Sequence, residues 1–98
     1  MVVEGATDSV APNCRVVAIE WQRLTGARSY QVQVRVGRRG AWVAVKGDPR
    51  CGGGKPIGPT DFHDRVMRPA GMRYYRVVAL AADGTSLDVT AAVPVQVE

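Results

Sequence analysis

Metal binding and much of covalent catalysis depend on histidine and cysteine side chains, and this chain has few of them. Its 98 residues include one histidine, His63, and two cysteines, Cys14 and Cys51, which lie far apart in the sequence. A structural zinc site needs about four ligands, which usually come from closely spaced cysteine and histidine residues. The sequence therefore predicts no metal site and no cofactor.

A serine-histidine-aspartate triad can be drawn only from residues that do not suit it. Ser29, His63 and Asp64 are the candidates, but no serine has the Gly-x-Ser-x-Gly surroundings of a nucleophile elbow. His63 and Asp64 are also neighbours on an expected strand, where successive side chains point to opposite faces, and His63 is expected to face solvent as a plain polar residue. The pair Asp61 and Asp64 is better interpreted as turn and edge residues. We therefore expect no catalytic residues and no enzymatic activity.

The run Gly52-Gly53-Gly54-Lys55 has the composition of a phosphate-binding loop but not its pattern. It lacks the Gly-x-x-x-x-Gly-Lys-Ser/Thr spacing and the following helix whose amide groups would bind phosphate. Residues 47–60 as a whole contain five glycines and three prolines. Such a stretch predicts a long loop, and long loops in small domains are usually functional or disordered.

A disulfide between Cys14 and Cys51 is conceivable by count, but the expected topology opposes it. Cys14 opens the second expected strand at one end of the domain, and Cys51 follows the fourth strand near the other end. A strand of seven residues spans about 23 Å, whereas the Cα atoms of a disulfide lie about 4.4 to 6.8 Å apart. The sequence favours two free thiols. In the alternative, the long loop folds back across the domain and allows the bridge.

Arginine supplies most of the positive charge of the chain. The formal net charge is +4, with 13 lysines and arginines against 9 aspartates and glutamates. The basic residues are spread along the sequence instead of forming one block, which is typical of solvent-exposed charge on alternate strand positions. We therefore expect no nucleic-acid partner.

Trp42 is the aromatic residue whose role the sequence leaves open. It follows the turn at Gly40 on a strand whose alternation does not clearly bury it. An exposed tryptophan beside Arg38 and Arg39 would suit contact with a protein or a sugar. In the alternative, which the pattern favours slightly, Trp42 caps the core beside a hairpin.

Alternation with a period of two, interrupted by Gly, Pro, Asp and Asn, predicts an all-β chain. Seven strands are expected, at residues 2–6, 15–21, 29–36, 41–46, 60–66, 73–80 and within 87–97. Residues 7–13 should connect the first two strands, and Pro94 should interrupt the last strand or confine it to an edge. About 100 residues suffice for an immunoglobulin-like sandwich. We therefore expect one domain over residues 1–98, folded as a seven-stranded antiparallel β-sandwich with Trp21 buried between its sheets.

Several motifs follow one another at spacings that recur in one known family. They are Val17-x-Ile19-x-Trp21, Gly26-Ala27-x-x-Tyr30-x-Val32, Phe62-x-Asp64, Pro69-Ala70-Gly71, Tyr74-Tyr75-Arg76-Val77-x-Ala79 and Ala82-Asp83-Gly84-Thr85-Ser86. Over nearly its whole length the chain resembles a fibronectin type III domain of the bacterial or phage variety. One departure is that Arg73 stands where the family usually has a corner tyrosine. Tyr74 could take that role after a shift of one residue.

The resemblance implies a non-catalytic protein-interaction or spacer module of a larger exported bacterial protein, such as an adhesin or a polysaccharide-degrading enzyme. Its partner would be a protein or a carbohydrate, outside the cell or at its surface. The alternative is a small complete structural protein, such as a decoration or tail component of a phage virion. Met1 close to the first strand and the lack of a secretory signal motivate this alternative. No apolar run is long enough to span a membrane, and the oligomeric state stays open.

The expected topology places two candidate binding surfaces at opposite ends of the domain. Loops at residues 22–28, 47–60 and 81–86 would share one end. The basic residues there are Arg23, Arg28, Arg50 and Lys55. The hairpin tip with Arg38, Arg39 and Trp42 would lie at the other end. Because loops on a rigid scaffold commonly carry recognition, we expect an acidic or polar partner at the loop end.

Overall fold

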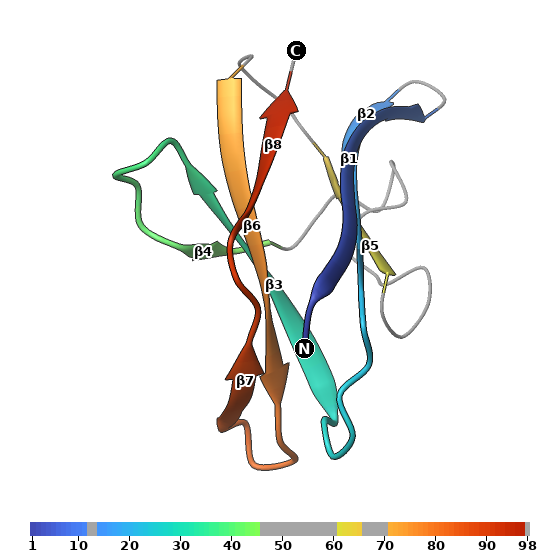
Figure 1. Cartoon of the computed structure of the whole chain (residues 1–98), viewed down its shortest axis with the longest axis vertical. Coiled ribbons are helices and arrows are strands. Elements are labelled where there is room, and N and C mark those ends of the chain that lie inside the picture. Colours follow the sequence, from blue (N-terminus) through green and yellow to red (C-terminus); the bar gives the residue numbers. More distant parts are fainter. Residues whose placement is uncertain (12–13, 46–60, 66–70, 98) are drawn as a thin grey trace.

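The protein is described by a computed structural model, which covers the backbone of residues 1–11, 14–45, 61–65 and 71–97 and the side chains of residues 1–6, 17–45 and 71–97. Every regular element in these ranges is a β-strand, and the strands form two sheets that pack face to face (Figure 1). The predicted all-β sandwich is therefore confirmed. The same ranges contain no helix long and apolar enough to cross a membrane.

The smaller sheet has three antiparallel strands in the order β1-β2-β5. They are β1 (Val3–Ala11), β2 (Cys14–Trp21) and β5 (Asp61–Arg65). β1 is longer than the sequence predicted, because its pairing with β2 continues as far as Ala11 opposite Cys14. The predicted connection was wrong over residues 7–11. Thr7 and Val10 are β-branched, which suits a paired strand.

The larger sheet has a last strand that is divided into two pieces. Its order is β4 (Val43–Ala44), β3 (Ser29–Val36), β6 (Gly71–Leu80) and then β7 (Ser86–Val89), with β8 (Val93–Val97) also paired to β6. β3 occupies one edge of β6, so β7 and β8 share the other edge, one after the other. Counted as one divided strand, they complete the seven strand positions of the predicted sandwich.

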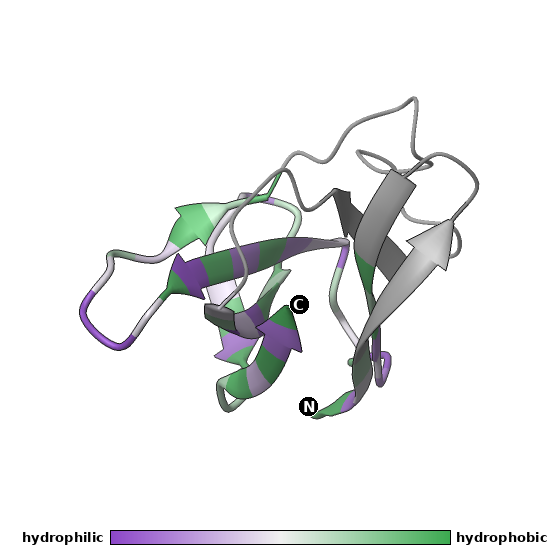
Figure 2. Cartoon of the chain, turned by 90° about the horizontal axis from the view of Figure 1, so that it is seen from above, coloured by the Kyte–Doolittle hydropathy of each residue, from purple (hydrophilic) through white to green (hydrophobic). Residues whose placement is uncertain are grey.

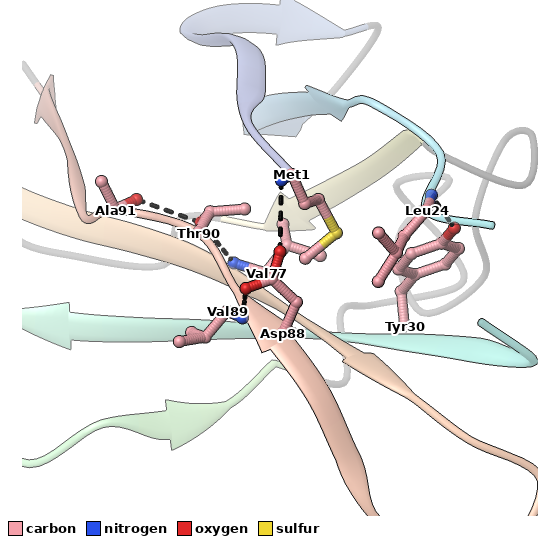
Figure 3. Close-up of polar contacts among 8 residues, drawn as sticks. All are labelled: Met1, Leu24, Tyr30, Val77, Asp88, Val89, Thr90 and Ala91. Atoms are coloured by element: carbon pink, nitrogen blue, oxygen red, sulfur yellow. Dashed lines mark hydrogen bonds and ion pairs between the residues drawn. The ribbon is translucent and has the colours of Figure 1, made fainter. Parts of the chain in front are cut away.

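A buried threonine explains where the last strand divides. Thr90 is 5% exposed, and its backbone N–H donates to the carbonyl oxygen of Val77 at 3.0 Å. The N–H of Val77 donates in return to Oγ1 of Thr90, also at 3.0 Å (Figure 3). The side-chain oxygen of Thr90 thus accepts the hydrogen bond that a backbone carbonyl would accept in a regular ladder. Regular pairing with β6 resumes at Val93. Pro94 lies in β8, at the edge position that the sequence predicted.

The hairpin between β3 and β4 is confirmed, although β4 is shorter than the predicted residues 41–46. Its ladder pairs Gln33 with Ala44 and Val34 with Val43. Gly37 has a φ of 75°, a conformation that favours glycine. At Gly40 a Cβ atom would lie 2.8 Å from the carbonyl oxygen of Val36, too close for any other residue without movement. Two glycines therefore shape the turn that leads the chain to Trp42.

The core between the sheets is built from one face of each main strand. Its buried cluster comprises Val17, Ile19, Trp21, Val32, Tyr75, Val77, Val95 and Val97. Trp21 is 3% exposed, which confirms its predicted burial, and its ring lies 5.5 Å from that of Tyr30 in a tilted arrangement. The N–H of Leu24 donates to the hydroxyl of Tyr30 at 2.9 Å and so fixes the loop after β2 against the core (Figure 3).

Three sequence predictions concern residues outside the described ranges. They are the unpaired state of Cys14 and Cys51, the loop at residues 47–60, and a solvent-facing side chain for His63. The backbone of Cys14 and of His63 belongs to β2 and β5, but their side chains are not described. These three predictions stay predictions.

Candidate binding surface

The outer face of the larger sheet carries a polar and aromatic surface. Along β3, Val32 is buried in the core, so its neighbour Gln33 points to the opposite face. Along β6, Tyr75 and Val77 are buried, and Arg76 between them points outward. Figure 2 shows the resulting alternation as hydrophilic and hydrophobic bands along the strands. One set of side chains therefore makes the core, and the set between them makes a solvent-facing surface.

Trp42 lies on this outer face against two arginine side chains. Its ring centroid is 4.9 Å from Cζ of Arg35 and 4.3 Å from Cζ of Arg76. Arg35 also lies over the ring of Tyr74, at 5.0 Å. All four side chains are half-buried. Each contact has the geometry of a cation–π interaction, which is worth about 0.5 to 1 kcal/mol at exposed sites and more where water is excluded.

Glutamine side chains hold one of these arginines in place. Gln33 lies opposite Arg76 in the register of β3 and β6. Nε of Arg76 donates to Oε1 of Gln33 at 2.6 Å, and Nε2 of Gln33 donates to Oε1 of Gln31 at 2.7 Å. We call the five residues Gln33, Arg35, Trp42, Tyr74 and Arg76 the arginine–tryptophan cluster. The ring contacts and the hydrogen bond thus orient the two arginine side chains.

Exposed apolar side chains border the cluster. Met72 is 39% exposed at one end of β6, and Leu87 and Val89 on β7 are 48% and 45% exposed. Met72 pairs with Gln96 in β8, and Val89 pairs with Val78. Their positions in the alternation place them on the outer face, because Val95, Val97 and Thr90 beside them are buried. The surface thus combines arginine, aromatic and aliphatic side chains.

Two sequence predictions about this surface were wrong. Trp42 does not cap the core, because it lies on the opposite face of the sheet. The cations over its ring come from β3 and β6, whereas Arg38 and Arg39 are exposed at the hairpin tip. Tyr74 does not take the position of a corner tyrosine either, because it faces outward under Arg35.

The two predicted ends of the domain are present as expected in the described residues. The N–H of Arg28 donates to the carbonyl oxygen of Leu80 at 2.8 Å, which brings the loop after β2 beside the turn after β6. The N–H of Gly37 donates to the carbonyl oxygen of Met72 at 3.2 Å, at the far end of the same sheet. Arg23 and Arg28 are exposed at the first end. The other two basic residues assigned there, Arg50 and Lys55, lie outside the described residues.

Carboxylates offset the positive charge of the loop end. Hydrogen bonds from the hydroxyl of Thr85 (2.6 Å) and from its N–H (3.0 Å) lower the pKa of Asp83. A hydrogen bond from the Met1 ammonium group, 3.2 Å from Oδ2, lowers the pKa of Asp88, and the N–H of Val89 adds to the effect (Figure 3). Both carboxylates are ionised at neutral pH. The charge of Asp88 is balanced by the Met1 ammonium group, so Asp83 is the carboxylate that offsets the arginines among the described residues of this end.

The residues considered for catalysis are not brought together in the backbone. Ser29 begins β3 in the larger sheet, whereas His63 and Asp64 belong to β5 in the smaller sheet. Asp61 and Asp64 pair with Glu20 and Val17 of β2, although their side chains are not described. Among the described side chains, no group of three potential metal ligands occurs. The arginine–tryptophan cluster is therefore the clearest candidate site.

Part of this cluster could have been found from the sequence. Extending the hairpin ladder by one residue from Val34 and Val43 places Trp42 opposite Arg35, on the outward side. The contribution of Arg76 depends on its register with Gln33, which lies 43 residues earlier in the chain. No local pattern indicates such a register, and sequence reasoning therefore missed Gln33, Arg35, Tyr74 and Arg76 as site residues.

Comparison with known proteins supports the fold. No protein-family model matches the sequence, and no curated protein matches it either. The chain is similar to the crystal structure of a Fn3-like protein from Clostridium thermocellum, with 19% sequence identity and a TM-score of 0.67. The similarity covers 98% of this chain and 91% of that one. At this identity the likeness concerns the fold alone, and the expected fibronectin type III-like fold is confirmed.

Proposed function

We propose that this fibronectin type III-like domain is a non-catalytic protein-binding module that contacts its partner through the outer face of its larger sheet. Folds of this kind typically serve as spacers or interaction modules and share no active site. The observation that carries the proposal is the position of Trp42. Its ring is half-buried against two guanidinium groups on the face that the core does not use.

The composition of this face supports binding over simple solvation. Tryptophan, tyrosine, methionine and arginine are enriched at protein interfaces, and tryptophan, tyrosine and arginine dominate their binding energy. Trp42, Tyr74, Arg35 and Arg76 lie together here, and Met72 borders them. Contacts within the cluster already restrict the long arginine side chains. Less conformational entropy is then lost when a partner binds.

Site-specific photocrosslinking in the cells that make the native protein tests this proposal. A photoreactive amino acid at Gln96 would probe the outer face, and one at Gln22 would probe the loop end; both positions are exposed. We expect Gln96 to capture another protein, and Trp42→Ala to abolish that crosslink. Crosslinks from Gln22 with none from Gln96 would assign binding to the loop end and contradict the proposal.

We further propose that the module belongs to a larger exported bacterial protein. The sequence motifs and the likeness to a bacterial Fn3-like structure support this setting. The native reading frame provides the test. Coding sequence that continues on both sides of residues 1–98 is expected, together with an export signal. A start codon at Met1 and a stop codon after Glu98 would instead favour a small complete protein, such as a virion component.

A further inference from the structure

We infer that the arginine–tryptophan cluster binds carboxylate groups of an acidic protein segment. This inference rests on the proposed function and names the chemistry of the partner. It starts from two guanidinium groups, those of Arg35 and Arg76, that lie 4.9 and 4.3 Å from the Trp42 ring centroid on the outer face of the larger sheet.

Among the described side chains, the positive charge of this face has no acidic counterpart. The carboxylates among the described side chains lie elsewhere: Glu4 and Glu20 in the smaller sheet, Asp83 in the turn after β6, and Asp88 beside the Met1 ammonium group. The outward positions of the larger sheet hold glutamine, aromatic and aliphatic residues around the two arginines. An acidic partner would supply the missing counter-charges, since electrostatic complementarity steers association and fixes orientation.

The contacts of the two guanidinium groups leave donors for a carboxylate. Stacking on an aromatic ring engages the flat face of a guanidinium and leaves the N–H groups at its edge available. Arg76 donates a hydrogen bond to Gln33 through Nε, so its two terminal nitrogen atoms do not take part in that bond. Nε of Arg35 is buried without a hydrogen-bond partner among the described residues, so the terminal nitrogen atoms are its remaining donors. Such paired donors match the geometry of a carboxylate.

A protein segment fits this surface better than a sugar or a nucleic acid. Sugar rings usually bind by stacking on an open aromatic face, but guanidinium groups lie over the Trp42 ring at 4.3 and 4.9 Å. A nucleic acid would need a longer basic stripe than two arginines. The exposed side chains of Met72, Leu87 and Val89 instead offer apolar contacts beside the cations. Mixed acidic and apolar protein segments complement this combination.

Nuclear magnetic resonance titration of the whole domain tests the inference, because its two tryptophans provide a site probe and an internal control. The ligand is a synthetic peptide that alternates glutamate and threonine, and the matched peptide has glutamine in place of glutamate. We expect the indole N–H signal of Trp42 and the side-chain amide of Gln33 to move with the glutamate peptide. The signal of Trp21, which is buried, should stay in place, and the glutamine peptide should have no effect.

A charge-matched pair of variants separates the site from net charge. Arg35→Gln with Arg76→Gln should weaken binding of the glutamate peptide at least about tenfold, whereas Arg38→Gln with Arg39→Gln removes the same charge at the hairpin tip and should change it less than about twofold. Unchanged Trp42 signals at millimolar peptide, or equal losses in both variants, would overturn the inference. Stronger binding of a heparin oligosaccharide or a DNA duplex at the same residues would also overturn it. A protein crosslink from Gln96 without peptide binding would keep the proposed function and reject only the acidic partner.

Discussion

Trp21 and Trp42 illustrate how the face of a strand decides the role of a residue. Trp21 is 3% exposed and contacts Tyr30 within the core. Trp42 lies on the opposite face of the larger sheet, where Arg35 and Arg76 cover it. Both are tryptophans on or beside alternating strands, so residue type alone does not distinguish them. The register of each residue relative to the neighbouring strands distinguishes the two roles.

A substitution at Thr90 tests the contact that divides the last strand. Thr90→Val keeps the shape of the side chain but removes the oxygen that accepts the N–H of Val77. A buried donor left without a partner costs about 1 to 3 kcal/mol, and we expect the free energy of unfolding to fall by that amount in urea. Thr90→Ser retains the hydroxyl, and its free energy of unfolding should fall clearly less than that of Thr90→Val. Equal stability of Thr90→Val and the wild type would contradict the assigned hydrogen bond.

Asp88 should make stability depend on pH in the acidic range. In the isolated domain of residues 1–98, where Met1 has a free ammonium group, the folded pKa of Asp88 is lowered, first by the hydrogen bond from that group. The stabilisation is therefore present above the unfolded pKa of about 3.9 and is lost as pH falls through the folded pKa. Asp88→Asn should lower the urea midpoint at neutral pH, and the difference from the wild type should vanish in strong acid. A difference that is the same at both pH values would show that the ion pair is not its cause.

The strands β3 and β6 each serve the fold with one face and the candidate site with the other. Val32 and Val77 point into the core, while Gln33 and Arg76 face outward and bond to each other. Alternation with a period of two in the sequence predicts one inward and one outward face for such a strand. What it could not supply was the partner of each outward residue. That depends on pairing between distant strands, as for Gln33 and Arg76, which lie 43 residues apart in the sequence.

Local patterns also misjudged two strand boundaries for identifiable reasons. Polar residues in 7–11 suggested a connection, yet pairing with β2 extends β1 to Ala11. The break after Val89 arises because Thr90 offers a side-chain oxygen to Val77, a contact between strands that no single segment reveals. By contrast, the turn after Leu80 was predicted correctly. Asp83 and Gly84 form it, with Gly84 at a φ of 85° and Thr85 bonded to Asp83.

Gly40 links the shape of the hairpin to the position of Trp42. A Cβ atom at this residue would lie 2.8 Å from the carbonyl oxygen of Val36, which belongs to the backbone and cannot rotate away. We expect Gly40→Ala to destabilise the domain by about 1 to 3 kcal/mol and to shift the indole signal of Trp42.

Gly5→Ala is the matched control for the Gly40 substitution. A Cβ atom at Gly5 would meet no atom within 4 Å, and the residue lies in a strand. The stability of the Gly5→Ala variant should equal or slightly exceed that of the wild type, because alanine restricts the unfolded chain more than glycine does. If Gly40→Ala behaves like Gly5→Ala in unfolding and leaves the Trp42 signal in place, the close approach at the turn does not position the cluster.

At the scale of the whole molecule, a sandwich can separate folding from binding because its sheets have two faces. The fibronectin type III-like topology was predictable, since its motifs follow in order along nearly the whole sequence and the architecture tolerates large sequence differences. The loop end and the hairpin tip also lie at opposite ends, as expected. The expectation of a binding surface at the loop end came from the loops and charges in the sequence, and it stays a prediction.

The core should be stable without the side chains of the outer face. The most direct test compares the free energies of unfolding of Trp21→Ala and Trp42→Ala, measured in urea on the same domain. Trp21→Ala should cost about 3 to 5 kcal/mol, because it removes a large buried ring from the core. Trp42→Ala should cost about 1 to 2 kcal/mol, because the half-buried ring makes two cation–π contacts of about 0.5 to 1 kcal/mol each. Equal and large losses in the two variants would show that Trp42 is part of the structural framework, and would contradict its assignment to a binding surface.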